Sequence, residues 1–539
     1  MTIRDLSKSE AKIITLSTPL CVIGGGIAGL LIACRIAKSG RRVVLIESGY
    51  TSFDADIHKL NEIDDPTGRY TRALDGRFRG LGGSSSRWGG RMIPISAYEL
   101  GPRPDIAQPA WPIDTEMLDD YEREIEAIFQ IDNSPYDNSG SARVDPNGLF
   151  PRDEKHITRR WAKCPDYRNC NVATLLAKQL KDLKNLDIWL GATVCDFSLD
   201  SDRGRLRGIA AQNLNGNTLS IVADDFILAA GAIESTRLLH LLDAKSEGRA
   251  FAGCHALGRY FQDHLKAKVA TINRRNAHLT NRLFAYRFVN STRRDLHLEL
   301  SEHAQRQDAS ASAFAYSAMD LASSPLADLR QFLRGLQKRD VSSRQVLQLL
   351  GNGGFFARAA YWRYAKGQVF IPEDIDLGLM VCAEQLPVAA NRIRLSDKDD
   401  RFGMRKARIE WTPTYAEEHT FRTTIRHLDF YWRNSGFDRF CPLKLTPAAE
   451  NAAIPIIDDA EACAHPSGST RMGLNPPDSV VGPDLRCHAV PNIAVASSSV
   501  FPTAGSANPT FTIMKMALWL ADSYLGGKVT PKAVLEPTA

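Results

Sequence analysis

A strand, a glycine-rich turn and a helix follow one another near the start of the chain, and this pattern constrains the fold more than any other feature. Residues 20–23 form a short, continuously apolar run, which is typical of a strand buried on both faces. Gly24, Gly26 and Gly29 follow at the G-x-G-x-x-G spacing, and residues 28–38 are expected to form the next helix. The pattern predicts a βαβ unit of a Rossmann-like α/β fold with a parallel sheet.

The same segment predicts a dinucleotide site, because each glycine has a separate role. The first permits the tight turn, the second lets the backbone approach a pyrophosphate, and the third lets the helix pack closely on the sheet. The helix would direct its free N–H groups and its positive dipole end at the phosphates. A second strand over residues 42–46 leads to Glu47, whose carboxylate can accept from ribose hydroxyls and would repel the 2′-phosphate of NADP. These residues alone leave FAD and NAD open.

Two later segments favour FAD. Residues 226–235 predict another buried strand, which ends in small residues, Ala230 among them, that allow a helix to begin beside a ligand. Residues 80–90 hold five glycines and three serines, so the backbone of this loop can come within hydrogen-bonding reach of a flat ring. The alternative is a flexible surface turn, and Arg87 and Trp88 in the middle of the loop argue against it.

The C-terminal part of the chain adds two motifs. His465 opens the stretch H-P-S-G-S-T-R-M-G, and Asn508 and Pro509 stand in A-N-P-T-F-T. Together with the glycine segments, these motifs resemble the glucose–methanol–choline (GMC) oxidoreductases, which are flavoenzymes that oxidise alcohols. Within that family the pyranose-oxidase and sugar-dehydrogenase branch is the most similar, because it pairs a His with an Asn.

The resemblance implies a set of cofactor contacts. In pyranose oxidase a His of the glycine–serine loop is bonded to the flavin, whereas Arg87 stands at the corresponding position here, so we expect non-covalent FAD. The family's V-A-D-A-S is replaced by V-A-S-S-S at residues 495–499, which puts one flavin contact in doubt. No metal is expected. The implied cofactor-binding residues are Gly24, Gly26, Gly29, Glu47, Gly83, Ser84, Arg87, Trp88, Gly89, Val194, Ala230, Pro509 and Thr510.

Alcohol oxidation needs a base for the hydroxyl proton and an acceptor for the hydride, and a neutral imidazole suits the first task. The resemblance assigns the base to His465 and substrate positioning to Asn508. The alternative for His465 is a core histidine satisfied by backbone groups. A plain N-cap role of Asn508, before Pro509, is compatible with its substrate role. Glu384 and Gln385, at the end of an expected strand, are candidate substrate contacts, although such a polar pair is often merely solvated.

The expected organisation is a discontinuous FAD-binding domain with an inserted substrate domain. We assign residues 13–105, 180–270 and 460–530 to the FAD-binding domain. Residues 106–179 and 271–459 are assigned to an α+β substrate-binding domain built on a mixed or antiparallel sheet.

Two features are expected within the substrate domain. Strands over residues 391–396 and 406–411 would belong to the sheet that covers the reactive face of the flavin. A helical insertion near residues 320–365 includes amphipathic helices over 321–338 and 342–350, which could form a lid, an oligomer contact or a membrane-surface patch. A lid or packing element is favoured, because the basic charge is not dense enough for membrane docking.

Composition excludes several other classes. The 539 residues are 44% apolar and 24% charged, as in globular proteins. The net charge is only +5, and the basic residues are interspersed with acidic ones, which argues against nucleic acid as the main partner. Ten scattered cysteines without a C-x-x-C pair argue for reduced thiols and against zinc, iron–sulfur or haem sites. No signal-peptide pattern begins the chain, so a cytoplasmic location is expected.

These observations predict an FAD-dependent oxidoreductase that converts a hydroxyl group of a sugar or glycoside to the carbonyl, with the hydride passing to flavin N5 and His465 acting as base. The expected partners are a small-molecule substrate and an external electron acceptor, either O2 or another, so oxidase and dehydrogenase both remain open. The alternatives are oxidation of a bulky apolar alcohol such as a sterol, and a non-redox lyase on the same fold.

Overall fold

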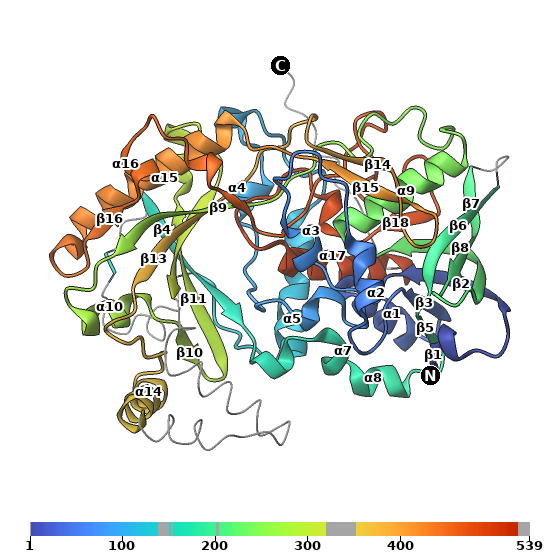
Figure 1. Ribbon diagram of the computed structural model, residues 1–539, viewed down its shortest axis with the longest axis horizontal. Helices are drawn as coiled ribbons and strands as arrows, with labels where there is room; N and C mark the ends of the chain where they lie inside the picture. The colour runs from blue at the N-terminus through green and yellow to red at the C-terminus, as the bar shows by residue number, and fades with distance from the viewer. Residues whose placement is uncertain (1, 138–149, 152–154, 201–203, 320–351, 527–539) are drawn as a thin grey trace.

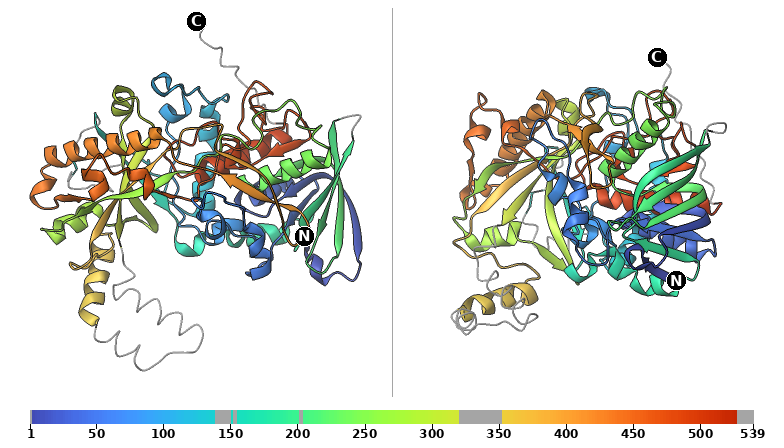
Figure 2. Two further views of the ribbon diagram at one scale, coloured as in Figure 1. Left: turned by 45° about the horizontal axis from the view of Figure 1, so that its top comes forward. Right: turned by 45° about the vertical axis from the view of Figure 1, so that its right-hand side comes forward.

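The computed structural model describes residues 2–137, 150–151, 155–200, 204–319 and 352–526. Two eight-stranded sheets and one two-stranded sheet organise these residues. Figure 1 shows the two large sheets in separate lobes, and both turned views in Figure 2 keep the lobes apart. Each large sheet has its own cluster of buried apolar side chains, so the chain has two cores.

The first sheet is the Rossmann-like element that the glycine pattern predicts. Its strand order is β1-β5-β3-β2-β8-β7-β6, with β18 alongside β8. Neighbouring strands pair in parallel from β1 to β8 in this order, and β18 is also parallel to β8. The pairings of β7 with β8 and of β6 with β7 are antiparallel. The strands are β1 (Thr2–Asp5), β2 (Ile13–Ile23), β3 (Val43–Glu47), β5 (Leu186–Leu190), β6 (Thr193–Asp200), β7 (Arg205–Gln212), β8 (Thr218–Leu228) and β18 (Ile493–Val495).

The first sheet extends beyond its predicted limits at the N-terminal side. The strand predicted over residues 20–23 is the last part of β2, whose residues 13–18 pair with residues 218–223 of β8. β1 lies outside the FAD-binding domain assigned from residue 13, yet it pairs with β5 and forms an edge of the sheet. Side chains at the start of β2 alternate mostly between exposed and half-buried positions. The sequence there is therefore less continuously apolar than at the buried end of the strand, and it predicts a strand less clearly.

The two ends of the chain meet in this lobe. Helix α1 (Ile27–Lys38) packs against helix α17 (Pro509–Tyr524), and Figure 1 shows these blue and red segments in the same lobe. Arg35 of α1 reinforces the contact with an ion pair to Asp522 at 2.8 Å. This lobe is therefore built from distant parts of the sequence.

The second sheet is antiparallel, with the order β10-β11-β12-β13-β9-β16, while β17 pairs with β9 and β4 with β11. The long helix α15 (Tyr415–Asn434) packs on it. The domain boundary predicted at residue 270 falls inside β9, and the boundary predicted at residue 460 falls directly before β17. Both strands belong to the second sheet. Its strands are β4 (Ile157–Cys164), β9 (Leu265–Ile272), β10 (Arg287–Val289), β11 (Thr292–Leu300), β12 (Ala313–Met319), β13 (Leu377–Ala383), β16 (Leu443–Leu445) and β17 (Glu461–Ala462).

The strands expected over residues 391–396 and 406–411 form a hairpin of their own instead of joining the large antiparallel sheet. β14 (Arg392–Asp399) forms a two-stranded sheet with β15 (Arg405–Glu410), and both contact helix α9 (Ala232–Lys245). Arg237 of α9 holds the hairpin through an ion pair to Asp400 at 2.6 Å and a bond to the Arg405 carbonyl. The expectation that these strands belong to the sheet over the flavin is therefore wrong.

The helices predicted over residues 321–338 and 342–350 lie outside the described residues, whereas α14 (Gly353–Ala365) covers the end of the expected insertion. Within the described part of the chain, no helix combines the length and apolar character needed to cross a membrane. The remaining helices are α2 (Ala55–His58), α3 (Arg72–Asp75), α4 (Ala97–Leu100), α5 (Glu122–Phe129), α7 (Val172–Leu175), α8 (Ala177–Asp182), α10 (Ala277–Phe284), α11 (Glu302–Gln307) and α16 (Pro447–Glu450).

Candidate active site

The carboxyl ends of four parallel strands converge on one cavity of about 600 Å³. Gly24 follows β2, Glu47 ends β3, Ala229 follows β8 and Ala496 follows β18, and all four line the cavity. Ligands of open α/β sheets bind at this edge, so the sheet places the cavity where a dinucleotide is expected.

The three fingerprint glycines have different surroundings. A Cβ on Gly29 would lie 2.0 Å from the Gly24 carbonyl oxygen, so this glycine permits the close approach of α1 to the turn. Gly24 has φ +111°, and a Cβ there would meet the Ala229 carbonyl oxygen at 2.5 Å. A Cβ on Gly26 would have only that oxygen within reach, at 4.0 Å. Gly26 therefore leaves space for a ligand, while the other two permit the local packing.

Glu47 lies at the cavity with both carboxylate oxygens fixed. Its Oε2 accepts from the Gly25 N–H at 2.7 Å, and its Oε1 accepts from the Gly49 N–H at 2.8 Å. Burial raises the pKa of this carboxyl, against the lowering effect of the two N–H donors. The side chain is held at the strand end, where the fingerprint predicts a ribose contact.

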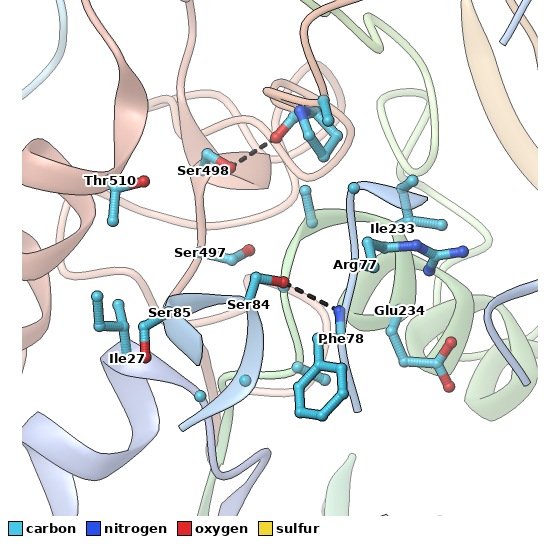
Figure 3. Close-up of a pocket in the computed structure, with 18 of the residues that line it drawn as sticks. Ile27, Arg77, Phe78, Ser84, Ser85, Ile233, Glu234, Ser497, Ser498 and Thr510 are labelled. Carbon is cyan, nitrogen blue, oxygen red and sulfur yellow. Dashed lines mark hydrogen bonds between the residues drawn. The ribbon is translucent and has the colours of Figure 1, made fainter. Parts of the chain in front are cut away.

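The glycine–serine loop packs directly on the fingerprint. A Cβ on Gly83 would lie 2.8 Å from the Gly26 Cα. Figure 3 shows Ser84 and Ser85 of this loop near Ser497, Ser498 and Thr510 of the C-terminal segment, with Ile233 and Glu234 of α9 to one side. The loop and the C-terminal segment thus contribute to the same cavity.

Arg87 and Trp88 have defined partners within this loop. The Arg87 guanidinium lies 4.7 Å from the ring centre of Phe53 and 4.5 Å from that of Phe78. Trp88 donates its Nε1 hydrogen to the Cys170 carbonyl at 2.9 Å. The loop is therefore anchored by side-chain contacts, which favours a binding role over a flexible surface turn.

Nearly all predicted cofactor residues share this cavity. Gly29 is the exception, since it packs behind the turn. Direct contact of each residue with FAD stays a prediction. The predicted residues that line the cavity are Gly24, Gly26, Glu47, Gly83, Ser84, Arg87, Trp88, Gly89, Val194, Ala230, Pro509 and Thr510.

His465 and Asn508 lie side by side in the cavity wall. The Asn508 Nδ2 is 3.1 Å from the His465 Nε2, and the His465 Nδ1 is 2.9 Å from the His264 Nδ1. The His264 Nε2 is 2.7 Å from the Gly505 carbonyl oxygen, which can only accept. A neutral His264 must therefore donate from Nε2 and accept at Nδ1. His465 then carries its hydrogen on Nδ1, and its Nε2 lone pair faces Asn508.

The surroundings keep His465 neutral. Burial lowers its pKa well below 6.5, and the positive charges of Arg91 and Lys266 lower it further. Asp263 holds the backbone at this position, because its Oδ1 accepts from the His465 N–H at 2.9 Å. Burial raises the pKa of the Asp263 carboxyl to about 7. A neutral, tautomerically fixed imidazole is suited to accept a proton at Nε2.

Asn508 occupies the N-cap position of α17, but its side chain makes no cap bond to the helix. Its Nδ2 is used by His465, and its Oδ1 is buried without a hydrogen-bond partner among the described residues. The N-cap role that the sequence suggests is therefore limited to the backbone. A buried amide oxygen without a partner at a cavity wall indicates that a ligand completes the site.

Two segments of the chain match known protein families. Residues 387–517 match the GMC oxidoreductase profile, and residues 22–53 match that of an NAD(P)-binding Rossmann-like domain. Over residues 387–517 the chain is therefore similar to the GMC oxidoreductases.

Three relatives illustrate the family likeness. The chain is 32% identical to a 2-methyl-1,2-propanediol dehydrogenase of Mycolicibacterium austroafricanum, over 28% of this chain and 26% of the relative. It is 30% identical to a paromamine 6′-oxidase of Streptomyces fradiae, over 30% of this chain and 28% of the relative. The matches thus span just over a quarter of these two relatives. Pyridoxine 4-oxidase from Mesorbium loti has a similar fold, with a TM-score of 0.54 and 17% identity over 94% of this chain and 99% of that one.

Glu384 and Gln385 do not lie where substrate contacts are expected. Both are fully buried, and neither lines the cavity. Glu384 pairs with Arg103 at 2.6 Å and accepts from the Gly505 N–H at 3.0 Å. Gln385 accepts from the Asp263 N–H at 3.0 Å. Their polar groups are committed to residues that hold His264 and His465, so we revise their role to positioning.

Some residues of the site are not evident from the sequence. His264 contacts His465 but does not line the cavity, and the Asp263-His264 pair in the sequence gives no sign of this contact. Three cations of the cavity wall, Arg91, Lys266 and Arg293, are also missed by sequence reasoning, because they come from separate segments that only the fold brings together. We refer to these three residues as the cationic wall.

Proposed function

We propose that this chain is a GMC oxidoreductase, which binds FAD and oxidises a hydroxyl group of its substrate to a carbonyl. The observation that carries the proposal is the pair formed by the His465 Nε2 and the Asn508 amide, 3.1 Å apart, in the wall of a cavity that also contains the nucleotide fingerprint. The names of the relatives, a dehydrogenase and an oxidase, support the reaction class.

The residues present fit FAD. Gly24, Gly26 and the start of α1 would receive the pyrophosphate, and Glu47 would accept from the ribose. The unpartnered Asn508 Oδ1 supports a ligand at the opposite end of the cavity as well. Arg87 cannot form the bond that a loop histidine would, so attachment is non-covalent. When bound, FAD would supply the acceptor for the hydride.

His465 and Asn508 would act together on the hydroxyl. A hydroxyl group placed against both side chains would replace their mutual hydrogen bond. Its oxygen would accept from the Asn508 amide, and its proton would pass to the His465 Nε2 lone pair. Positioned general-base catalysis of this kind contributes about 10²–10⁴-fold. His264 retains the productive tautomer by accepting from the His465 Nδ1 hydrogen. Asn508 holds the substrate oxygen, which fixes the direction of the attached carbon.

A polar alcohol such as a sugar or glycoside is the favoured substrate. The cavity beside His465 contains the cationic wall and the Tyr316 hydroxyl, and charged groups of this kind disfavour a bulky apolar alcohol such as a sterol. The electron acceptor is an external one, O2 or another oxidant, and its identity separates an oxidase from a dehydrogenase.

The test is anaerobic flavin absorbance of the purified protein with a panel of monosaccharides, glycosides, polyols and sterols. We expect bleaching by a polar alcohol, and subsequent admission of oxygen distinguishes the two acceptor types. Denaturation should release the flavin into the supernatant. A yellow protein that dithionite bleaches but no alcohol does would contradict the proposal and support a non-redox lyase. Bleaching by sterols alone would contradict the substrate class.

A further inference from the structure

We propose that the substrate of this enzyme carries an anionic group, a carboxylate or a phosphate, and that the cationic wall binds it while His465 faces the hydroxyl. The inference rests on the proposed function and specifies its substrate class. Three properties of the wall support it, namely its position, its charge balance and its unused hydrogen-bond donors.

The cationic wall belongs to the substrate side of the cavity. Lys266 lies on β9 and Arg293 on β11, both in the second sheet, and Arg91 follows the glycine–serine loop. The charges of Arg91 and Lys266 act on His465, which places them near the candidate base. The cofactor pyrophosphate is expected at the fingerprint of the first sheet, so these cations are available to a different ligand.

The cations outnumber the carboxylates that neutralise them. Arg91 and Arg293 share Asp295, each at 2.9 Å. Lys266 shares Glu461 with Arg72, which also lines the cavity, at 3.4 Å and 2.6 Å respectively. Four cations thus share two carboxylates, which leaves an excess of two positive charges in this part of the described structure.

The other acidic residues that line the cavity are engaged elsewhere. Glu47 accepts from backbone N–H groups at the nucleotide end, and Glu234 pairs with Arg79 at 2.9 Å and with Arg237 at 3.0 Å. The charge of Asp75 acts on His58, on the side of the glycine–serine loop. Among the described residues, none of these three is paired with the cationic wall.

The wall also has hydrogen-bond donors to spare. Asp295 takes up the Nε and Nη2 groups of Arg91 and Arg293, and the Nη1 groups of both have no partner among the residues described. Arg91 lies over the Tyr316 ring, 5.3 Å from its centre, so a phenol adjoins the same surface. Two guanidinium groups and an ammonium around one space match the oxygens of a carboxylate or a phosphate.

Lys266→Met is the sharpest test, because the partner Glu461 is exposed and loses little by the change. Lys268→Met is a matched control, since Lys268 lies two residues along the same strand and does not line the cavity. The probes are glucose, gluconate and glucose 6-phosphate, which differ in the presence and type of anion. Binding to the oxidised holoenzyme is followed by the flavin difference spectrum and by calorimetry, so no turnover is required.

We expect one of the two anions to bind at least about tenfold more tightly than glucose, as a charge-assisted contact would provide. Gluconate and glucose 6-phosphate then distinguish a carboxylate site from a phosphate site. Lys266→Met should remove most of this preference and weaken glucose binding much less than anion binding, and Lys268→Met should behave as the parent. Arg293→Lys, which keeps the charge beside Asp295, should reduce the preference less.

Equal binding of glucose and both anions, or no binding of either anion, would overturn the proposal. So would an equal loss for neutral and anionic probes in Lys266→Met, because that would assign the cations to the cofactor or the fold. Failure of every alcohol to bleach the flavin would instead count against the oxidation reaction, and the anion preference can be measured regardless of that result.

Discussion

His264 donates from Nε2 to the Gly505 carbonyl, and this bond determines which nitrogen of His465 is free. Glu384 holds the Gly505 backbone in place, because it accepts from the Gly505 N–H at 3.0 Å and is itself paired with Arg103. The proton-accepting Nε2 thus depends on residues that never face the cavity. Partners of this kind commonly affect the activity of the group they orient.

His264→Phe should retain FAD but slow flavin reduction by about 10–100-fold, because His465 loses the acceptor for its Nδ1 hydrogen. His264→Gln should recover part of the rate, since its amide can both accept from His465 and donate to Gly505. Stopped-flow reduction rates, compared at equal flavin content and equal melting temperature, make the measurement. A His264→Phe variant that reduces at the parental rate would remove this positioning role.

At the residue scale, sequence reasoning proposes His465 and Asn508 through a family motif, and the structure brings the two side chains together. It misjudges Glu384 and Gln385, because a polar pair at the end of a strand has no sequence signal that separates a cavity position from a buried network. The cationic wall is unpredictable for a related reason. Its members come from residues 91, 266 and 293, and the pairing of strands in the second sheet is not encoded in local patterns.

At the element scale, the βαβ unit follows directly from the sequence, since an apolar run and three spaced glycines are local signals. The hairpin of β14 and β15 is recognisable as strands, but the sequence pattern assigns it to the wrong sheet. Strand propensity does not specify the partner, and here the ion pair between Arg237 and Asp400 ties the hairpin to α9.

Two glycines of the same turn should separate ligand binding from folding. Gly26 has a φ of −78°, and a Cβ added there would have only one atom within 4.0 Å, so Gly26→Ala should fold normally. Its methyl group would occupy ligand space, and FAD affinity should fall by about tenfold or more. Gly29→Ala should instead destabilise the apoprotein by about 2–4 kcal/mol, because its Cβ would overlap the Gly24 carbonyl.

Urea unfolding of the apoproteins and titration with FAD provide the two readouts for this pair. Parental FAD affinity in Gly26→Ala would refute the assignment of the turn to the pyrophosphate. Parental stability in Gly29→Ala would show that the turn can relax away from α1.

At the scale of the whole molecule, the fold brings the start and the end of the chain to one cavity. The fingerprint and α1 come from the N-terminal part of the chain, and Asn508 and α17 come from the last part of the described chain. The second sheet supplies the opposite wall through Lys266, Arg293 and Tyr316. Residues of both lobes line the cavity, so the proposed binding of cofactor and substrate would require both lobes to be folded and joined.

The central claim is that His465 accepts the hydroxyl proton in this cavity, and anaerobic flavin reduction in the parent and in His465→Ala tests it most directly. The variant should keep its FAD and lose about 10²–10⁴-fold in reduction rate. The base must be unprotonated, and its pKa is lowered well below 6.5, so the parental rate should stay level across neutral pH and fall only in acid. A His465→Ala variant that reduces its flavin at the parental rate, with the parental pH profile, would contradict the account.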